Sequence, residues 1–220
     1  MRTESTDTLL PSAARDPQPR HEAPAAARPA RREGGLLRAS LGFAAISLLG
    51  FGLAYAAATA SLGGLLFPGQ AAGSLIQRDG RIVGSAWVGQ PFAGDTYFHS
   101  RPSAASHDPM AMAGSNQARS NPDAQQRIAG ATVAVAAREG VPPEAVPDDL
   151  VTQSGSGVDP HISPAAAEIQ VARVARTRGL APERVRAAVA AHTEAAQFGV
   201  LGAPRVHVLQ LNLALDTMRP

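Results

Sequence analysis

The sequence of 220 residues contains no cysteine and no lysine, and it has few aromatic residues: one Trp, two Tyr and six Phe. The absence of cysteine excludes disulfides, thiolate metal sites and cysteine nucleophiles. The absence of lysine excludes a P-loop for nucleotide phosphates, because that motif requires a lysine. The formal net charge is only +2, and no group of arginines alternates with aromatic residues. We therefore expect no nucleic-acid partner.

Residues 1–35 are rich in Pro, Ala, Arg and Glu and have almost no large apolar side chains. Such a segment cannot bury enough apolar surface to offset the entropy lost on ordering. The composition predicts a disordered tail.

The segment that follows is apolar, and residues 39–77 include no charged side chain. Its centre, residues 41–62, is long enough to cross the roughly 30 Å hydrocarbon layer of a bilayer as a helix. Arginines crowd its N-terminal side, so the positive-inside rule places the N-terminus in the cytoplasm. We predict a single-pass protein of the bacterial inner membrane with a cytoplasmic tail (residues 1–35), a transmembrane helix (residues 36–67) and a periplasmic domain (residues 68–220).

Small residues recur on one face of the predicted helix, at spacings that let a second membrane helix approach closely. They are Ser47, Gly50, Ala54, Ala58 and Ser61. They predict a face that packs against a partner helix, although an alanine-rich composition alone produces similar patterns. A cleaved signal peptide is the alternative, since residues 56–58 and 58–60 resemble cleavage sites. The apolar stretch and the charged tail are both longer than a signal peptide usually has.

The external domain begins with a predicted β-hairpin over residues 74–83, because Asp79-Gly80 suits a tight type I′ turn. The second strand is expected to continue to Trp87 and Val88. Residues 89–122 are rich in Gly, Pro, Ser, Asn and Asp and are expected to form a loop.

Three helices are predicted from their end signals, a Pro at the first position or a Gly after the last. One runs from Asn121-Pro122 to Gly140, one from Ser163-Pro164 to Gly179, and one starts at Pro182 with Val185, Ala188, Val189 and His192 as candidates to face inward. Residues 205–209 alternate as a strand, and residues 211–215 either extend it or close as a short turn. The predicted fold class is α+β, with a small sheet covered by helices.

Residues 154–164 bring serine, aspartate and histidine together, as a nucleophilic triad would require. Triad members, however, usually come from distant segments, with the nucleophile on a strained turn. Local roles explain these residues better: Asp159 forms an Asx turn, Ser163 caps a helix and His161 is hydrogen-bonded in a loop. We predict no catalytic residue.

Histidines do not cluster in the way that metal sites require. His99 and His107 lie eight residues apart in a loop, whereas His161, His192 and His207 are scattered. No H-x-x-x-H pair on a helix and no carboxylate cluster accompanies them, so no metal site is predicted.

Eight short stretches appear together in one order. They are residues 73–76 (GSLI), 88–92 (VGQPF), 97–104 (YFHSRPSA), 114–116 (GSN), 120–122 (SNP), 147–157 (PDDLVTQSGSG), 159–164 (DPHISP) and 206–212 (VHVLQLN). In combination they resemble the KdpC family, the C subunit of the Kdp potassium-transporting P-type ATPase. The resemblance extends from the apolar segment to about Asp216. Residues 1–35 have no counterpart in the usual short start of the family.

The resemblance implies a non-catalytic subunit of a high-affinity, ATP-driven potassium importer, needed for assembly and coupling. Its partners would be a channel-like potassium-binding subunit and an ATP-hydrolysing subunit, often with a small fourth subunit. The family is described as a catalytic chaperone that raises the ATP affinity of the hydrolysing subunit. No cofactor is expected on this chain itself, because the complex handles ATP and potassium, and the predicted topology separates the external domain from cytoplasmic ATP.

Exposed loops carry binding more often than helices do, so the candidate subunit contacts are loop residues. They are His99, Arg101, Ser154, Asp159 and His161. Two other functions stay open from the sequence: a membrane-anchored periplasmic hydrolase that uses Ser154, Asp159 and His161, and an anchored binding module that acts alone.

Overall fold

A computed structural model describes residues 33–219. The predicted tail lies outside these residues, apart from its last three, with which the first helix begins. The chain divides into two units, residues 1–56 and 57–220, which we describe separately.

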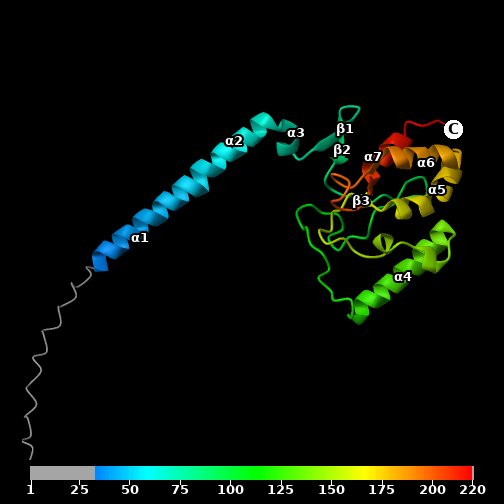
Figure 1. The fold of residues 1–220 in the computed structure, drawn as a ribbon, viewed down its shortest axis with the longest axis horizontal. Coiled ribbons are helices and arrows are strands. Elements are labelled where there is room, and N and C mark those ends of the chain that lie inside the picture. The colour runs from blue at the N-terminus through cyan, green and yellow to red at the C-terminus, as the bar shows by residue number, and fades with distance from the viewer. Residues whose placement is uncertain (1–32, 220) are drawn as a thin grey trace, which may run out of the picture. The chain divides into compact units, whose positions relative to one another are not determined.

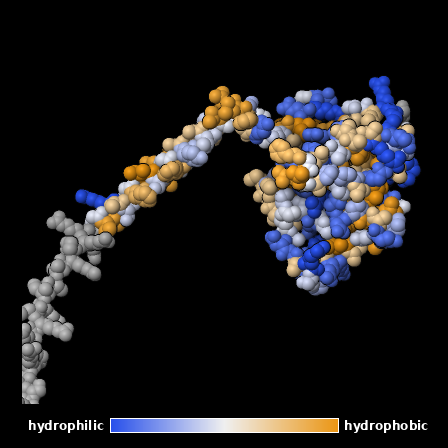
Figure 2. Space-filling view, in the orientation of Figure 1, coloured by the Kyte–Doolittle hydropathy of each residue, from blue (hydrophilic) through white to orange (hydrophobic). Residues whose placement is uncertain are grey.

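The apolar segment forms a continuous helical run of α1 (Glu33–Ser47), the π-helix η1 (Leu48–Tyr55) and α2 (Ala56–Leu66) (Figure 1). By length and composition, Gly35–Leu66 is able to cross a membrane. Its large apolar side chains are exposed, among them Phe43 (74%) and Phe51 (75%), and Figure 2 shows apolar side chains along the run. A helix without a polar face is stable in lipid or inside a larger assembly.

The π-helix interrupts the predicted packing face. Gly50 and Ala54 lie in η1, Ser47 ends α1, and Ala58 and Ser61 lie in α2. An i→i+5 turn holds more residues than an α-turn, so residues spaced for a 3.6-residue period do not stay in one straight line through η1. The small residues therefore divide at η1, and their contact with a partner helix stays a prediction.

A short helix, α3 (Pro68–Ala71), precedes an antiparallel hairpin of β1 (Leu75–Arg78) and β2 (Arg81–Ser85). The predicted turn is confirmed, because Asp79 and Gly80 have φ values of +52° and +75°. The predicted continuation of the second strand to Trp87 and Val88 is wrong. Ser85 ends the strand because its Oγ donates to Gly73 O at 2.7 Å and accepts from Trp87 N at 3.2 Å, which turns the chain.

Helices α4 (Pro122–Glu139), α5 (Pro164–Arg178) and α6 (Pro182–Ala191) begin and end close to the predicted residues. Asn121 accepts hydrogen bonds from the first turn of α4, and Ser163 accepts one from Ala166 N at the start of α5. Gly140 and Gly179 end these helices with φ values of 69° and 65°. Two 3₁₀ turns, η2 (Pro143–Ala145) and η3 (Asp148–Leu150), lie between α4 and α5.

A second, three-stranded antiparallel sheet has the order β3 (His161–Ile162), β5 (Arg205–His207) and β4 (Thr193–Glu194). The prediction of a strand to Leu209, followed by more strand or a turn, is wrong: Val208–Leu215 form helix α7. His207 starts this helix, because its ring Nδ1 accepts from Gln210 N at 3.3 Å. His192 forms the C-cap of α6 and is half-buried.

The core of the domain lies between α5, α6, α7 and the second sheet, and it includes residues from the long loop after β2. Phe98, Val174, Val206 and Leu211 are fully buried there. Burial of each such side chain contributes about 1.5–3 kcal/mol. Small sheets packed with helices after an apolar helix confirm the predicted α+β class.

Candidate functional site

The two loops predicted as contact segments lie against each other. Ser154 N donates to Pro102 O at 3.2 Å, and Ser103 Oγ donates to Gly157 O at 2.5 Å. Gly157 has a φ of +74°, and a Cβ there would lie 2.8 Å from Cβ of Ala105. Glycine is therefore required at this close approach. Residues 99–106 and 154–163 form one joint surface, which we call the double-loop surface.

Asp159 connects the two halves of the double-loop surface. Its Oδ2 accepts from an Arg101 NH group at 3.1 Å, while Oδ1 lies 3.0 Å from His161 N and 3.2 Å from His161 Nδ1. Burial acts to raise the pKa of Asp159, but hydrogen bonds from His161 and the charge of Arg101 outweigh it and hold the pKa below its usual value. The carboxylate therefore stays charged and locks Arg101 to β3.

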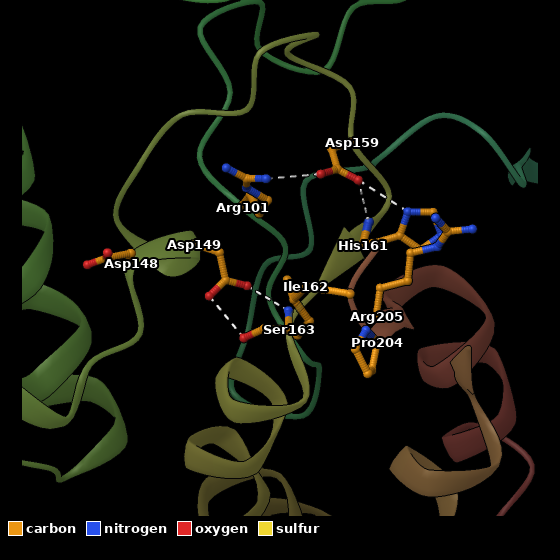
Figure 3. Close-up of a pocket in the computed structure, with 10 residues that line it drawn as sticks. Arg101, Asp148, Asp149, Asp159, His161, Ile162, Ser163, Pro204 and Arg205 are labelled. Carbon is orange, nitrogen blue, oxygen red and sulfur yellow. Dashed lines mark hydrogen bonds and ion pairs between the residues drawn. The ribbon is translucent and has the colours of Figure 1, made fainter. Parts of the chain in front are cut away.

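A pocket of about 410 Å³ opens beside this ion pair (Figure 3). Asp149 lines this pocket and holds Ser163, which also lines it. One carboxylate oxygen of Asp149 accepts from Ser163 N at 2.6 Å and the other from Ser163 Oγ at 3.1 Å. The pocket is lined by both signs of charge: Arg101, Asp148, Asp149, Asp159, His161, Ile162, Ser163, Ala203, Pro204 and Arg205. Mixed charge and an open shape are more typical of a polar contact surface than of an enclosed substrate pocket.

The residues of the alternative hydrolase do not form a triad. Asp159 and His161 pair as a base and its orienting carboxylate would. Ser154, however, is buried, lies 3.2 Å from Ser156 Oγ and accepts from Gly157 N. His161 Nε2 is buried with no hydrogen-bond partner in the described part of the chain. No nucleophile therefore meets the free ring nitrogen.

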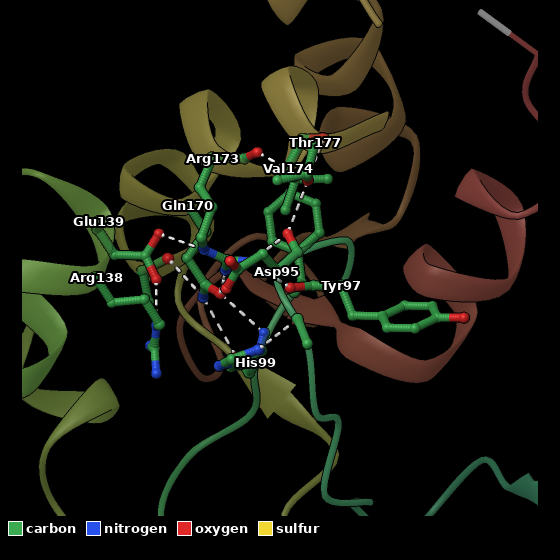
Figure 4. Close-up of polar contacts among 12 residues, drawn as sticks. Asp95, Tyr97, His99, Arg138, Glu139, Gln170, Arg173, Val174 and Thr177 are labelled. Atoms are coloured by element: carbon green, nitrogen blue, oxygen red, sulfur yellow. Dashed lines mark hydrogen bonds and ion pairs between the residues drawn. The ribbon is translucent and has the colours of Figure 1, made fainter. Parts of the chain in front are cut away.

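His99 lies beside a buried polar network that the sequence did not predict (Figure 4). Gln170 Oε1 accepts from His99 N at 2.8 Å, and Gln170 Nε2 donates to His99 O at 3.2 Å. Arg173, 2% exposed, donates to Gln170 Oε1 and to Glu139 Oε2, each at 2.9 Å. One side of α5 thus fixes the backbone at the start of the double-loop surface. Gln170 and Arg173 occupy positions between apolar residues of α5, and this placement is the only feature of the sequence that could have indicated their burial.

Two histidines, His161 and His207, lie in contact, but no third side chain completes a metal site with them in the described part of the chain. The rings of His161 and His207 pack edge to face with centroids 5.3 Å apart, and His207 Nε2 donates to Ala86 O at 2.8 Å. Burial lowers the pKa of His207. Within residues 33–219, no group of three His, Asp or Glu side chains lies close enough to hold a metal ion.

Comparison with known proteins covers most of the helical run and of the domain that follows it. The family model described as "K+-transporting ATPase, c chain" (KdpC) matches residues 37–217. The "Potassium-transporting ATPase KdpC subunit" of Xanthomonas oryzae pv. oryzae is 58% identical over 185 residues, which cover 84% of this chain and 88% of that protein. Proteins with the same name are 50% identical in Shewanella putrefaciens (82% of this chain, 88% of that protein) and in Polaromonas naphthalenivorans (84% and 96%).

Proposed function

The chain belongs to the KdpC family, and we propose that it is the accessory subunit of a high-affinity, ATP-driven potassium importer, needed for assembly and coupling. The observation that carries the proposal is the match over residues 37–217, which includes both the apolar helix and the external domain. The alternative hydrolase is not favoured, because Ser154 does not meet His161.

The helical run is the proposed anchor in the complex. Exposed apolar side chains along it require lipid or protein around them. The small residues before, within and after η1 would allow the helices of the larger subunits to approach closely. Substituting Ala54→Leu should weaken retention of the partners, whereas Ala45→Leu, an equal change away from the small residues, should not.

The double-loop surface is the proposed contact of the external domain with the channel-like subunit. Its ion pair between Arg101 and Asp159 is partly exposed, with side-chain exposures of 26% and 28%, so its polar groups are available to a partner. Arg101→Gln should reduce potassium-stimulated ATPase activity. Arg184→Gln removes the same charge from the exposed face of α6 and serves as the control.

Coupling to ATP is proposed to pass through the complex. With the N-terminus in the cytoplasm and the domain outside, nucleotide and domain lie on opposite sides of the membrane. A rise in ATP affinity would then be a coupling free energy between sites, with no direct contact between this domain and ATP.

The first experiment is a pull-down of the tagged chain from mildly solubilised membranes of potassium-starved cells. We expect two larger membrane proteins to co-purify, with potassium-stimulated ATP hydrolysis. Recovery of the chain alone, without ATPase activity, would overturn the proposal. His161→Ala then tests the hydrolase: loss of turnover on a substrate of its own would support that function.

Orientation is tested directly because the natural chain has no cysteine. A single cysteine at the exposed position Ala187 should react with a membrane-impermeant maleimide in intact spheroplasts. A cysteine at Ser12, in the tail, should react only after the membrane is permeabilised. The opposite pattern would place the domain in the cytoplasm.

A further inference from the structure

A second pocket lies on the domain between α4 and the loop that follows β2. It measures about 360 Å³, and it shares His99 and Arg101 with the double-loop surface. Its walls include apolar Phe92 and Val135 and the basic or titratable side chains of His99, Arg101, His107 and Arg138, with no carboxylate among its lining residues. A volume above 300 Å³, apolar walls and a few convergent polar groups are typical of small-molecule sites.

The buried carboxylate next to this pocket, Glu139, does not fully neutralise the positive charge of the arginines around it. Glu139 is shared by two guanidinium groups: Arg138 Nε donates to one oxygen at 2.7 Å and Arg173 Nε to the other at 2.9 Å. Two cations therefore face one anion, which leaves a surplus of one positive charge. The two terminal nitrogens of Arg138 make no hydrogen bond within residues 33–219, and its side chain is 31% exposed. This half of the guanidinium is free for a ligand.

Two histidine rings, His99 and His107, line the same pocket. His99 Nε2 donates to Gly94 O at 3.0 Å, so in the neutral ring Nδ1 carries no proton and can only accept a hydrogen bond. Burial lowers the pKa of His99 and, together with the positive charges of Arg138 and Arg173, outweighs the hydrogen bond to Gly94 and the charge of Glu139, which act to raise it. Burial also lowers the pKa of His107. Both rings are thus neutral near pH 7, and the pocket carries about one net positive charge. A bound monoanion would balance this charge, whereas a dianion would leave a negative charge over.

We propose that this pocket binds the carboxylate of a small organic monoacid, held by Arg138, with its apolar part against Phe92 and Val135 and the rings of His99 and His107 beside it. A guanidinium matches a carboxylate in shape and donates charge-assisted hydrogen bonds to it. Because Arg138 and Val135 belong to α4 and Phe92 to the loop, the ligand would join the two elements. It would thereby stabilise the loop that carries Arg101.

The test uses the full chain in mild detergent, labelled with ¹⁵N-histidine and titrated with isovalerate. We expect saturable shifts of the ring signals of His99 and His107, and none for His161, His192 and His207. Isovaleramide, which has the same shape without the charge, should bind at least about tenfold more weakly, since hydrogen bonds between charged groups contribute more than neutral ones. Sodium chloride at equal ionic strength is the ion control.

Two variants remove the site in different ways. Arg138→Gln should raise the dissociation constant of isovalerate about tenfold to a hundredfold. Ala134→Trp fills the pocket from the exposed face of α4 and should abolish the shifts. Arg184→Gln, a matched loss of charge outside the pocket, should leave binding unchanged. Unaltered His161 and His207 signals show that each variant is folded.

Three results would overturn the proposal. They are the absence of a saturable response of His99 and His107 to isovalerate, an equal response to chloride, and shifts that persist in folded Ala134→Trp.

Discussion

Replacement of Arg173 by methionine tests whether the buried network holds the domain together. Arg173 is 2% exposed and donates four hydrogen bonds. Its partners are Glu139 Oε2 (2.9 Å), Asp95 O (2.7 Å), Tyr97 O (2.9 Å) and Gln170 Oε1 (2.9 Å). These bonds attach α4 and the loop after β2 to α5. Methionine fills a similar volume but satisfies none of them.

The expected loss follows from the groups left behind. Removal of one partner from a buried ion pair costs about 3–5 kcal/mol. Arg173→Met should lie at the low end, because Arg138 still neutralises Glu139, with its Nε 2.7 Å from Oε1. Glu139→Met should lie at the high end, because it leaves a buried guanidinium with neutral acceptors only. A domain of this size loses roughly 2–4 °C in melting temperature per kcal/mol, so each variant should melt about 6–20 °C lower.

A double-mutant cycle provides the decisive measurement. Thermal unfolding of the full chain in detergent, followed by circular dichroism, gives the change in stability for each single variant and for Arg173→Met with Glu139→Met. The double variant leaves no buried unpaired charge, because Arg138, which also loses Glu139, is 31% exposed. It should therefore cost clearly less than the sum of the single changes, with a coupling of about 0.5–3 kcal/mol. If the two losses simply add, the ion pair contributes nothing as a pair and the reasoning is wrong.

Three further predictions concern backbone space and pH. Gly89→Ala should destabilise the domain by about 1–3 kcal/mol, since its Cβ would lie 2.5 Å from Asp159 O; an unchanged melting temperature would show that the backbone yields. Gly130→Ala should stabilise it by about 0.5–1 kcal/mol, because Gly130 lies inside α4 with open space around it; the same melting assay detects either sign. Burial lowers the pKa of His99 and His207 below 6.5, so the unfolded chain binds protons first and stability should fall as pH drops below 6.5. A melting temperature that stays constant from pH 7.5 to pH 5 would contradict this expectation.

Features whose signal lies within a few neighbouring residues could be predicted from the sequence. Asp79-Gly80 specifies its turn through positive φ values alone, and Ser163 specifies the start of α5 through one hydrogen bond to the first turn. The start of α7 could not be distinguished in the same way. Its alternating residues fit a strand as well as a buried helix, and the cap from His207 and the burial on more than one side decide for the helix.

The candidate site depended on contacts that sequence spacing does not encode. The double-loop surface joins Arg101 and Asp159, 58 residues apart, and each was predicted only as a member of a separate loop. Arg173 looked like an ordinary helix residue, because its partners Glu139 and Asp95 lie 34 and 78 positions away. Local propensity cannot indicate a buried arginine whose acceptors come from other elements.

Helix α7 ties the end of the chain to the beginning of the domain, and this determines when the domain is able to fold. Asn212 accepts from Phe98 N and donates to Phe98 O, 114 residues earlier, each at 2.9 Å. Asp216 pairs with Arg78, 138 residues earlier. During synthesis the early segments emerge first and wait without their native partners. Folding is therefore completed only after Asn212 and Asp216 have been synthesised, and we expect a chain truncated before Asn212 to stay unfolded rather than to form a shorter working subunit.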